Sequence, residues 1–230
     1  MSQIHFVGGE KGGVGKSVVA RLLAQYWIDR SLPFAALDAD LSHGALMRHY
    51  ADFSHAVDLG TASSADQIVD RALGAERRVL IDLPAQSSRA LSAWMDGANV
   101  LGLAEELATP ITFWHVSDGG HASAGQIGHA LDRYGDRASH VLVRNHARSK
   151  DFTQLDESMV TRKLESVGGK VMDLPELDAT AMYKIDHAGL SFWAAAYAEG
   201  DSALKPLERQ RVKLWLSRVY AEFDRVTAAA

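Results

Sequence analysis

The chain has 230 residues, 47% apolar and 23% charged, a balance typical of a globular protein with a single α/β domain over residues 1–230. The absence of cysteine excludes disulfides and thiolate metal sites. A net charge of −5 excludes a general attraction to nucleic acid or anionic lipid. The first apolar run is too short for a signal peptide, and no run approaches the roughly 20 apolar residues that cross a bilayer. We therefore expect a cytoplasmic protein.

Short apolar runs alternate along the chain with helix-length amphipathic stretches, which is typical of βαβ units. The predicted strands are Ile4–Val7, Phe34–Leu37, Val79–Ile81, Ile111–Val116, His140–Val143 and Lys170–Met172. The predicted helices are Lys16–Arg30, Ser64–Leu73, Ser88–Leu107, Ser123–Tyr134, Asp156–Val167 and Pro206–Val226. Most of the strands are apolar throughout, so we expect a mainly parallel twisted sheet with helices on both faces.

A glycine-rich loop with two lysines joins the first predicted strand to the first helix. It reads Lys11-Gly12-Gly13-Val14-Gly15-Lys16-Ser17. Such a strand-to-helix turn binds phosphate through backbone N–H groups, a helix N-terminus and a cation. Lys16 is placed to reach the β- and γ-phosphates, and the Ser17 hydroxyl is placed to coordinate Mg²⁺. The strict P-loop pattern requires glycine where this chain has Glu10, so the pattern fails by one residue.

With its second lysine, the loop resembles the deviant Walker A motif of the ParA/MinD family, KGGxGK followed by Ser or Thr. The resemblance implies a P-loop NTPase fold and an ATPase that binds ATP and Mg²⁺ as a homodimer. It also implies that Lys11 reaches across the dimer to the partner's ATP, while Lys16 is the ordinary P-loop lysine. The residues implied to contact the nucleotide here are Lys11, Gly12, Gly13, Val14, Gly15, Lys16, Ser17 and Val18.

Two acidic motifs follow the second and third predicted strands. Leu37-Asp38-Ala39-Asp40 resembles the family's D-x-D switch I motif, although Leu41-Ser42 replaces the Pro-Gln of many plasmid-partition members. The resemblance implies that Asp40 orients the attacking water and Asp38 supports the metal shell. The segment 79–85 resembles Walker B running into switch II, with Asp82 holding Mg²⁺ through water. The alternatives are a surface loop with two acids and a helix-entry aspartate.

Later segments resemble the family more weakly. Asn145 and Pro175 stand where the family places a residue that reads the adenine edge and a loop beside the base. The segment 115–120, His-Val-Ser-Asp-Gly-Gly, is similar to one in the conjugal-transfer branch; its alternative is a turn beside the nucleotide crevice. The ten histidines show no ligand spacing that would predict a metal site.

The last predicted helix carries apolar residues at helical spacing, Leu207 and Leu214 among them, together with many basic residues. Some family members end in a helix that lies on membrane. Acidic residues interrupt the basic face here, so we expect this helix to pack on the domain rather than bind membrane. Its basic residues, and those of the Arg144–Lys150 segment, leave non-specific DNA as a candidate partner.

The resemblance implies an ATP-driven dimer switch with slow hydrolysis. It would act with an unidentified activator or cargo protein in positioning, partition or transfer of a plasmid or protein cargo. The main alternative is an ATP-dependent metabolic ligase or synthetase on the same fold. The sequence has no signature of a second substrate pocket, and that function leaves Lys11 unexplained. A nucleotide-binding scaffold without turnover is a third alternative, which Asp40 argues against.

Overall fold

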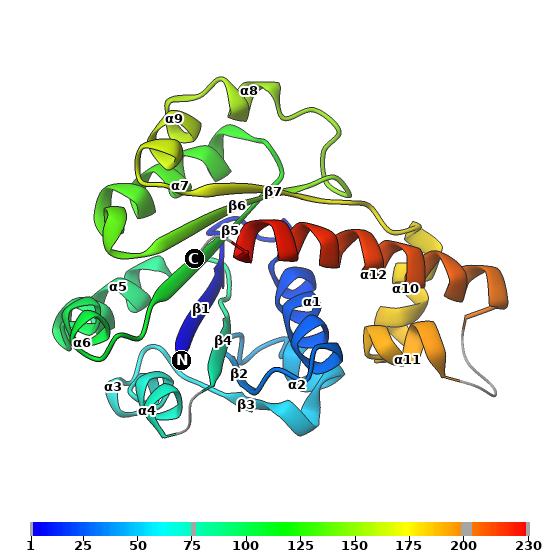
Figure 1. The fold of residues 1–230 in the computed structure, drawn as a ribbon, viewed down its shortest axis with the longest axis horizontal. Coiled ribbons are helices and arrows are strands. Elements are labelled where there is room, and N and C mark those ends of the chain that lie inside the picture. The colour runs from blue at the N-terminus through cyan, green and yellow to red at the C-terminus, as the bar shows by residue number, and fades with distance from the viewer. Residues whose placement is uncertain (1, 75–76, 199–203, 229–230) are drawn as a thin grey trace.

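One parallel seven-stranded sheet forms the centre of the molecule, in a computed structural model that describes residues 2–74, 77–198 and 204–228. The strands are β1 (Gln3–Gly8), β2 (Phe34–Asp38), β3 (Ser54–Ala56), β4 (Arg78–Asp82), β5 (Ile111–Ser117), β6 (Ser139–Asn145) and β7 (Lys170–Leu174). They lie in the order β3-β2-β4-β1-β5-β6-β7, and all neighbours are parallel (Figure 1). The predicted fold class is confirmed.

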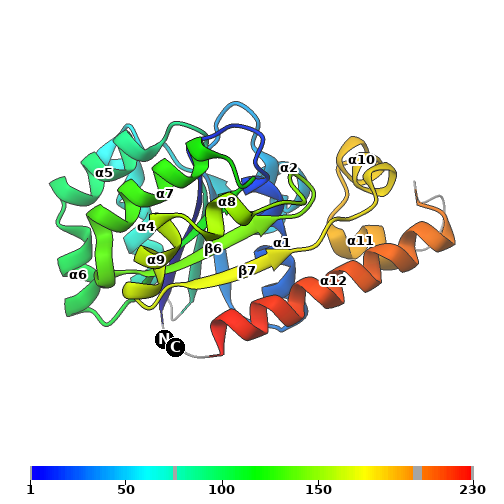
Figure 2. The ribbon, with the colours of Figure 1, turned by 90° about the horizontal axis from the view of Figure 1, so that it is seen from above.

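Helices cover both faces of the sheet (Figures 1 and 2). Their bounds are α1 (Lys16–Asp29), α2 (Ala45–His49), α3 (Ala62–Ala65), α4 (Gln67–Leu73), α5 (Ser88–Gly97), α6 (Val100–Glu106), α7 (His121–Tyr134), α8 (Thr153–Asp156), α9 (Met159–Ser166), α10 (Ala179–His187), α11 (Phe192–Tyr197) and α12 (Pro206–Thr227). Helices α1, α11 and α12 share one apolar core with the sheet, and the opposite face packs against α4 to α7 and α9.

Several predicted boundaries are wrong. The strand β3 and the helices α2, α10 and α11 were not predicted. Two of the predicted helices are each two helices: Ser64–Leu73 is α3 and α4, and Ser88–Leu107 is α5 and α6. The predicted helix Asp156–Val167 is α9, and α8 was not predicted. Between α5 and α6, Asn99 has φ 46°, a left-handed conformation that an α-helix cannot continue through. Apolar periodicity continues through such a break, so the pattern alone did not reveal it.

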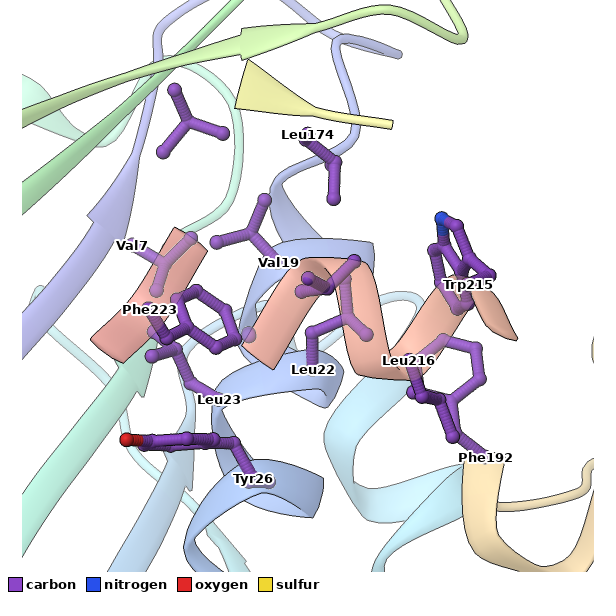
Figure 3. Close-up of a cluster of buried hydrophobic side chains, with 14 of the residues drawn as sticks. Val7, Val19, Leu22, Leu23, Tyr26, Leu174, Phe192, Trp215, Leu216 and Phe223 are labelled. Carbon is purple, nitrogen blue, oxygen red and sulfur yellow. The ribbon is translucent and has the colours of Figure 1, made fainter. Parts of the chain in front are cut away.

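The last helix packs on the domain, as predicted (Figure 3). Phe223 of α12 lies against Tyr26 of α1 with ring centroids 5.3 Å apart, and Trp215 packs edge-on against Phe192 of α11 at 5.1 Å. Burying each large apolar side chain stabilises the fold by about 2 kcal/mol. Leu207 and Leu214, counted in the apolar face of the predicted helix, are instead 73% and 50% exposed. None of the helices in the described part of the chain combines the length and apolarity needed to span a membrane.

The register of the parallel strands gathers the predicted motifs at one edge of the sheet. Val7 at the end of β1 pairs with Asp82 at the end of β4, and Asp82 pairs with Asp38 at the end of β2. On the other side of β1, Gly8 pairs with His115 of β5. Because ligands of open parallel sheets bind beyond the carboxyl ends of the strands, this edge is the candidate site.

Candidate nucleotide-binding site

The loop between β1 and α1 is closed on its inner side and open on its outer side. Gly15 has φ 105°, and a Cβ there would lie 2.3 Å from Nδ2 of Asn145, so no side chain fits. A Cβ on Gly12 or Gly13 would meet nothing within 4 Å. Helix α1 begins at Lys16 with no side-chain cap and no acidic residue in its first turn. The loop therefore offers an uncapped helix N-terminus and open space to an anion.

Lys16 lies inside the loop, and its predicted contact with the β- and γ-phosphates stays a prediction. Its side chain is largely buried, and its Nζ donates a hydrogen bond to the carbonyl oxygen of Lys11 at 3.0 Å. Burial lowers the pKa of Lys16, while the carboxylates of Asp82, Glu10 and Asp40 oppose that shift. The carbonyl of Lys11 therefore orients the ammonium group of Lys16 before any phosphate binds.

Asp82 is a buried carboxylate without a well-formed hydrogen bond to either oxygen among the described residues. Burial raises the pKa of Asp82 to about 7, with the charges of Asp38 and Asp40 adding to the rise and Ser17 and Lys16 opposing it. Leaving a buried carboxylate unpaired is costly, and a cation would supply the missing partner. Asp82 beside the Ser17 hydroxyl therefore fits Mg²⁺.

The protein alone supplies too few ligands for that ion. Among the described residues, no three His, Asp or Glu side chains form a group that could hold a metal. Mg²⁺ commonly takes one or two protein ligands and completes its shell with phosphate oxygens and water. A metal at Ser17 and Asp82 would accordingly depend on bound nucleotide.

The two switch I acids have different surroundings. Both oxygens of Asp38 accept backbone N–H bonds: Oδ1 from Asp40 at 3.1 Å and Oδ2 from Leu46 and Met47 at 2.8 and 3.3 Å, which caps α2. Burial raises the pKa of Asp38 in spite of these donors. Asp40 is half-buried and accepts from the N–H groups of Ser42 and His43 at 3.1 Å. The predicted roles of both acids in binding the metal and orienting water stay predictions.

Lys11 points away from the loop interior and pairs with Asp118 of the same chain. Asp118 follows β5, in the segment 115–120 singled out in the sequence. Its Oδ1 accepts from the Ser123 hydroxyl at 2.8 Å and from the Gly120 N–H at 3.2 Å, so Oδ2 remains for Lys11. Burial acts to raise the pKa of Asp118, but Lys11 and Ser123 outweigh it and keep it below its usual value. Sequence reasoning missed this acid.

The residues assigned to adenine are engaged within the chain. Asn145 is buried, its Nδ2 donates to the carbonyl of Val14 at 2.7 Å, and its Oδ1 accepts from the Ala147 N–H at 3.1 Å. The carbonyl of Pro175 accepts from the indole of Trp215 at 2.7 Å. Val18 donates its N–H to the carbonyl of Gly15 at 3.1 Å. Asn145 therefore supports the loop from β6, and the nucleotide contacts of all three residues stay predictions.

The buried histidines of this region form a structural pair. His140 Nε2 lies 2.9 Å from the carbonyl of Gly135, and its Nδ1 lies 2.9 Å from Nε2 of His115. A carbonyl can only accept, so Nε2 of His140 carries a proton and its Nδ1 accepts from His115. Burial lowers the pKa of His115 to about 3. Burial lowers the pKa of His140 as well, and the two rings lie nearly in one plane, joined edge to edge by this hydrogen bond, which is a packing role.

The fold and loop define a P-loop NTPase-like α/β protein, and comparisons with known proteins narrow this class. No family model matches the chain. It is 25% identical to "Protein TraL" of Escherichia coli over 97% of this chain and 98% of that protein. It is also 25% identical to "Protein MobD" of Acidithiobacillus ferrooxidans over 76% of this chain and 78% of that protein. The structure of the septum site-determining protein MinD of Pyrococcus horikoshii, complexed with Mg-ADP, superimposes with a TM-score of 0.59 at 16% identity. The superposition covers 99% of this chain and 98% of the MinD chain.

The comparisons bear out the resemblance drawn from the loop. The chain has the fold of the MinD ATPases and resembles the ParA/MinD family of deviant Walker A proteins.

Replacing Asp82 by asparagine is expected to stabilise the nucleotide-free protein. A carboxyl whose pKa is raised in the folded state costs stability once it ionises, so the wild type loses stability as pH rises from about 4 to 7. Asp82→Asn lacks that loss. In urea unfolding with EDTA present, the free energy of unfolding of Asp82→Asn is expected to exceed that of the wild type by on the order of 3 kcal/mol at pH 8. Near pH 4 the difference is expected to be close to zero.

The exposed Asp136→Asn variant is the control, with a change of about 0.5 kcal/mol or less. An Asp82→Asn protein less stable than the wild type at pH 8 would contradict the account of Asp82 as an unpaired buried charge.

Proposed function

We propose that the chain is an ATP-dependent dimerising switch of the ParA/MinD type, with ATP and Mg²⁺ as its ligands. The observation that carries the proposal is that the two lysines of the loop lie in different places. Lys16 fills the loop interior, whereas Lys11 stands at the outer lip, 44% exposed, on an ion pair at the surface. A lysine placed there is suited to a nucleotide facing it across a two-fold axis, where each subunit supplies the same group to the other.

In this proposal the chain's own residues divide the chemistry of ATP hydrolysis. Lys16 and the N-terminus of α1 would hold the phosphates, and Ser17 and Asp82 would hold a Mg²⁺ ion, which would neutralise charge on the phosphates. Asp40 orients the attacking water, and Lys11 of the partner subunit completes the site. Because the site is complete only in the dimer, turnover is limited by assembly and is slow.

We propose transfer of a plasmid or protein cargo as the process served. Two features support it: the segment 115–120 is similar to the conjugal-transfer branch of the family, and Leu41-Ser42 lacks the partition-type Pro-Gln. The similarity to proteins named TraL and MobD, nearly full-length for TraL, agrees with that branch. The proposed partners are a second copy of the chain and an activator or cargo protein.

Two basic residues of the Arg144–Lys150 segment offer less free positive charge to non-specific DNA than the sequence suggested. In the Arg144–Lys150 segment, Arg144 pairs with Asp156 and Asp173, and Lys150 pairs with Glu176. Charges already neutralised within the chain contribute little to phosphate binding.

The oligomeric state with different nucleotides tests the proposal. By sedimentation velocity, the protein is expected to be monomeric alone and with Mg-ADP, and dimeric with Mg²⁺ and a non-hydrolysable ATP analogue. A ligase or synthetase would show the same oligomeric state with both nucleotides. That result, or an absence of nucleotide binding in a parallel titration, would overturn the switch.

A further inference from the structure

Glu10, the residue at which the chain departs from the strict P-loop pattern, makes a contact with a distant helix. Its Oε1 accepts a hydrogen bond from the backbone N–H of Ser88 at 2.7 Å, across 78 positions of sequence. Ser88 is the first residue of α5, which follows Asp82 through the loop 83–87. A glycine at position 10 could not make this bond. Glu10 therefore joins the phosphate loop to α5, the helix that follows β4 and its predicted metal ligand Asp82.

Within the described part of the chain, no other side chain is seen to cap the N-terminus of α5. Ser87, at its N-cap position, makes no side-chain hydrogen bond to the helix, and its first turn contains no acidic residue. The carboxylate of Glu10 thus supplies both a hydrogen-bond acceptor and the negative charge favoured at a helix N-terminus. In the loop just before α5, Gln86 has φ 60°, a backbone conformation that residues other than glycine seldom adopt.

The same carboxylate lies near Lys16, the cation that would bind a polyphosphate. Glu10 is close enough to Lys16 for its charge to act on that ammonium group, together with Asp82 and Asp40. A nucleotide bound to the loop brings more negative charge to the same cation, and like charges repel. Beside Glu10 and Ser88 lies a cavity of about 390 Å³, also lined by Phe113 and His115. The Glu10 side chain therefore has room to move.

We propose that Glu10 is a positioning residue that couples occupancy of the phosphate loop to α5. Without nucleotide, its carboxylate holds the first turn of α5 against the loop. An arriving polyphosphate weakens that contact and releases the helix N-terminus, next to the segment after Asp82. This inference rests on the proposed binding of nucleotide and adds a route by which that binding changes the protein's surface.

Hydrogen exchange of the full chain, read by mass spectrometry on peptides covering residues 88–91, tests the coupling with and without saturating Mg-ADP. In the wild type, Mg-ADP is expected to speed exchange in the first turn of α5 about fivefold, the effect of losing a cap worth about 1 kcal/mol. Glu10→Gln keeps the acceptor and removes the charge, so it should protect this turn without nucleotide and respond little to Mg-ADP. Glu10→Gly should exchange about fivefold faster from the start, with no further response.

Two further measurements separate the possible outcomes. Glu10→Gln is also expected to bind Mg-ADP a few-fold more tightly, and Glu105→Gln, a surface carboxylate paired with Arg137, should match the wild type throughout. A wild type that binds Mg-ADP with unchanged exchange at α5 would overturn the coupling and leave the proposed function intact. A wild type that binds no nucleotide would overturn both, while the nucleotide-free Glu10→Gly result would still show whether the cap exists.

Discussion

A Lys11→Ala protein is expected to bind ATP as a monomer and to lose both ATP-dependent dimerisation and hydrolysis. Lys16 remains in the loop interior to hold the phosphates of its own subunit's nucleotide, so binding survives. The charge that builds on the transferring phosphoryl group then lacks the cation from the partner subunit. Trans-acting cations of this kind are worth about a thousandfold or more in rate. Nucleotide titration, sedimentation velocity and steady-state turnover measure the three properties separately.

A matched control and a mixing experiment make this prediction specific. Lys150→Ala removes another exposed lysine that pairs with an acid, Glu176, and is expected to behave as the wild type. Mixing Lys11→Ala with Asp40→Ala protein creates one hybrid site that holds both residues and one that holds neither, so part of the activity should return. A Lys11→Ala protein that dimerises and turns over normally would remove the basis of the switch proposal.

Lys16→Ala is expected to abolish ATP binding, whereas Asp40→Ala is expected to spare binding and trap the dimer. Lys16 is the cation in the loop interior, and without it a polyphosphate beside Asp82 and Asp40 loses the main cation that its own subunit supplies. Asp40 is bonded to its own turn, so its loss removes the positioned water and leaves the loop as it is.

Isothermal titration with a non-hydrolysable analogue, followed by single-turnover hydrolysis, distinguishes these two variants. Arg148→Ala, an exposed basic residue beyond β6, provides a matched control for loss of positive charge. Wild-type hydrolysis by Asp40→Ala would remove Asp40 from its proposed role. ATP binding of wild-type strength by Lys16→Ala would place the phosphates somewhere other than this loop.

The sequence predicted the parts of the fold that depend on local patterns. Strands covered on both faces are apolar along their whole length, so Phe34–Leu37 and Val79–Ile81 could be recognised from their own residues. The loop 11–17 could be placed after β1 because its residue types are demanded by the backbone itself. Gly15, for example, has a positive φ and no room for a Cβ. Short elements such as α2 and β3 have too few residues to show a period.

Contacts between distant segments could not be predicted. The partner of Lys11 is Asp118, and the partner of Glu10 is a backbone N–H at Ser88; each pair meets only because β1 lies between β4 and β5. Asp38 matched a metal-binding motif in the sequence, yet its Oδ2 caps a helix that the sequence did not predict. The motif identified the residue type at the site, while tertiary packing decided which atoms each residue contacts.

The close fit of Gly15 and Asn145 has an evolutionary consequence. The amide of Asn145 occupies the volume that a side chain at position 15 would need, and it also holds the carbonyl of Val14. A larger residue at 15 would push the amide out, and a larger residue at 145 would push into the loop. Neither position can change alone without cost, and because the positive φ at position 15 strains any side chain whatever space residue 145 leaves, both residues should stay unchanged in diverged descendants of this chain.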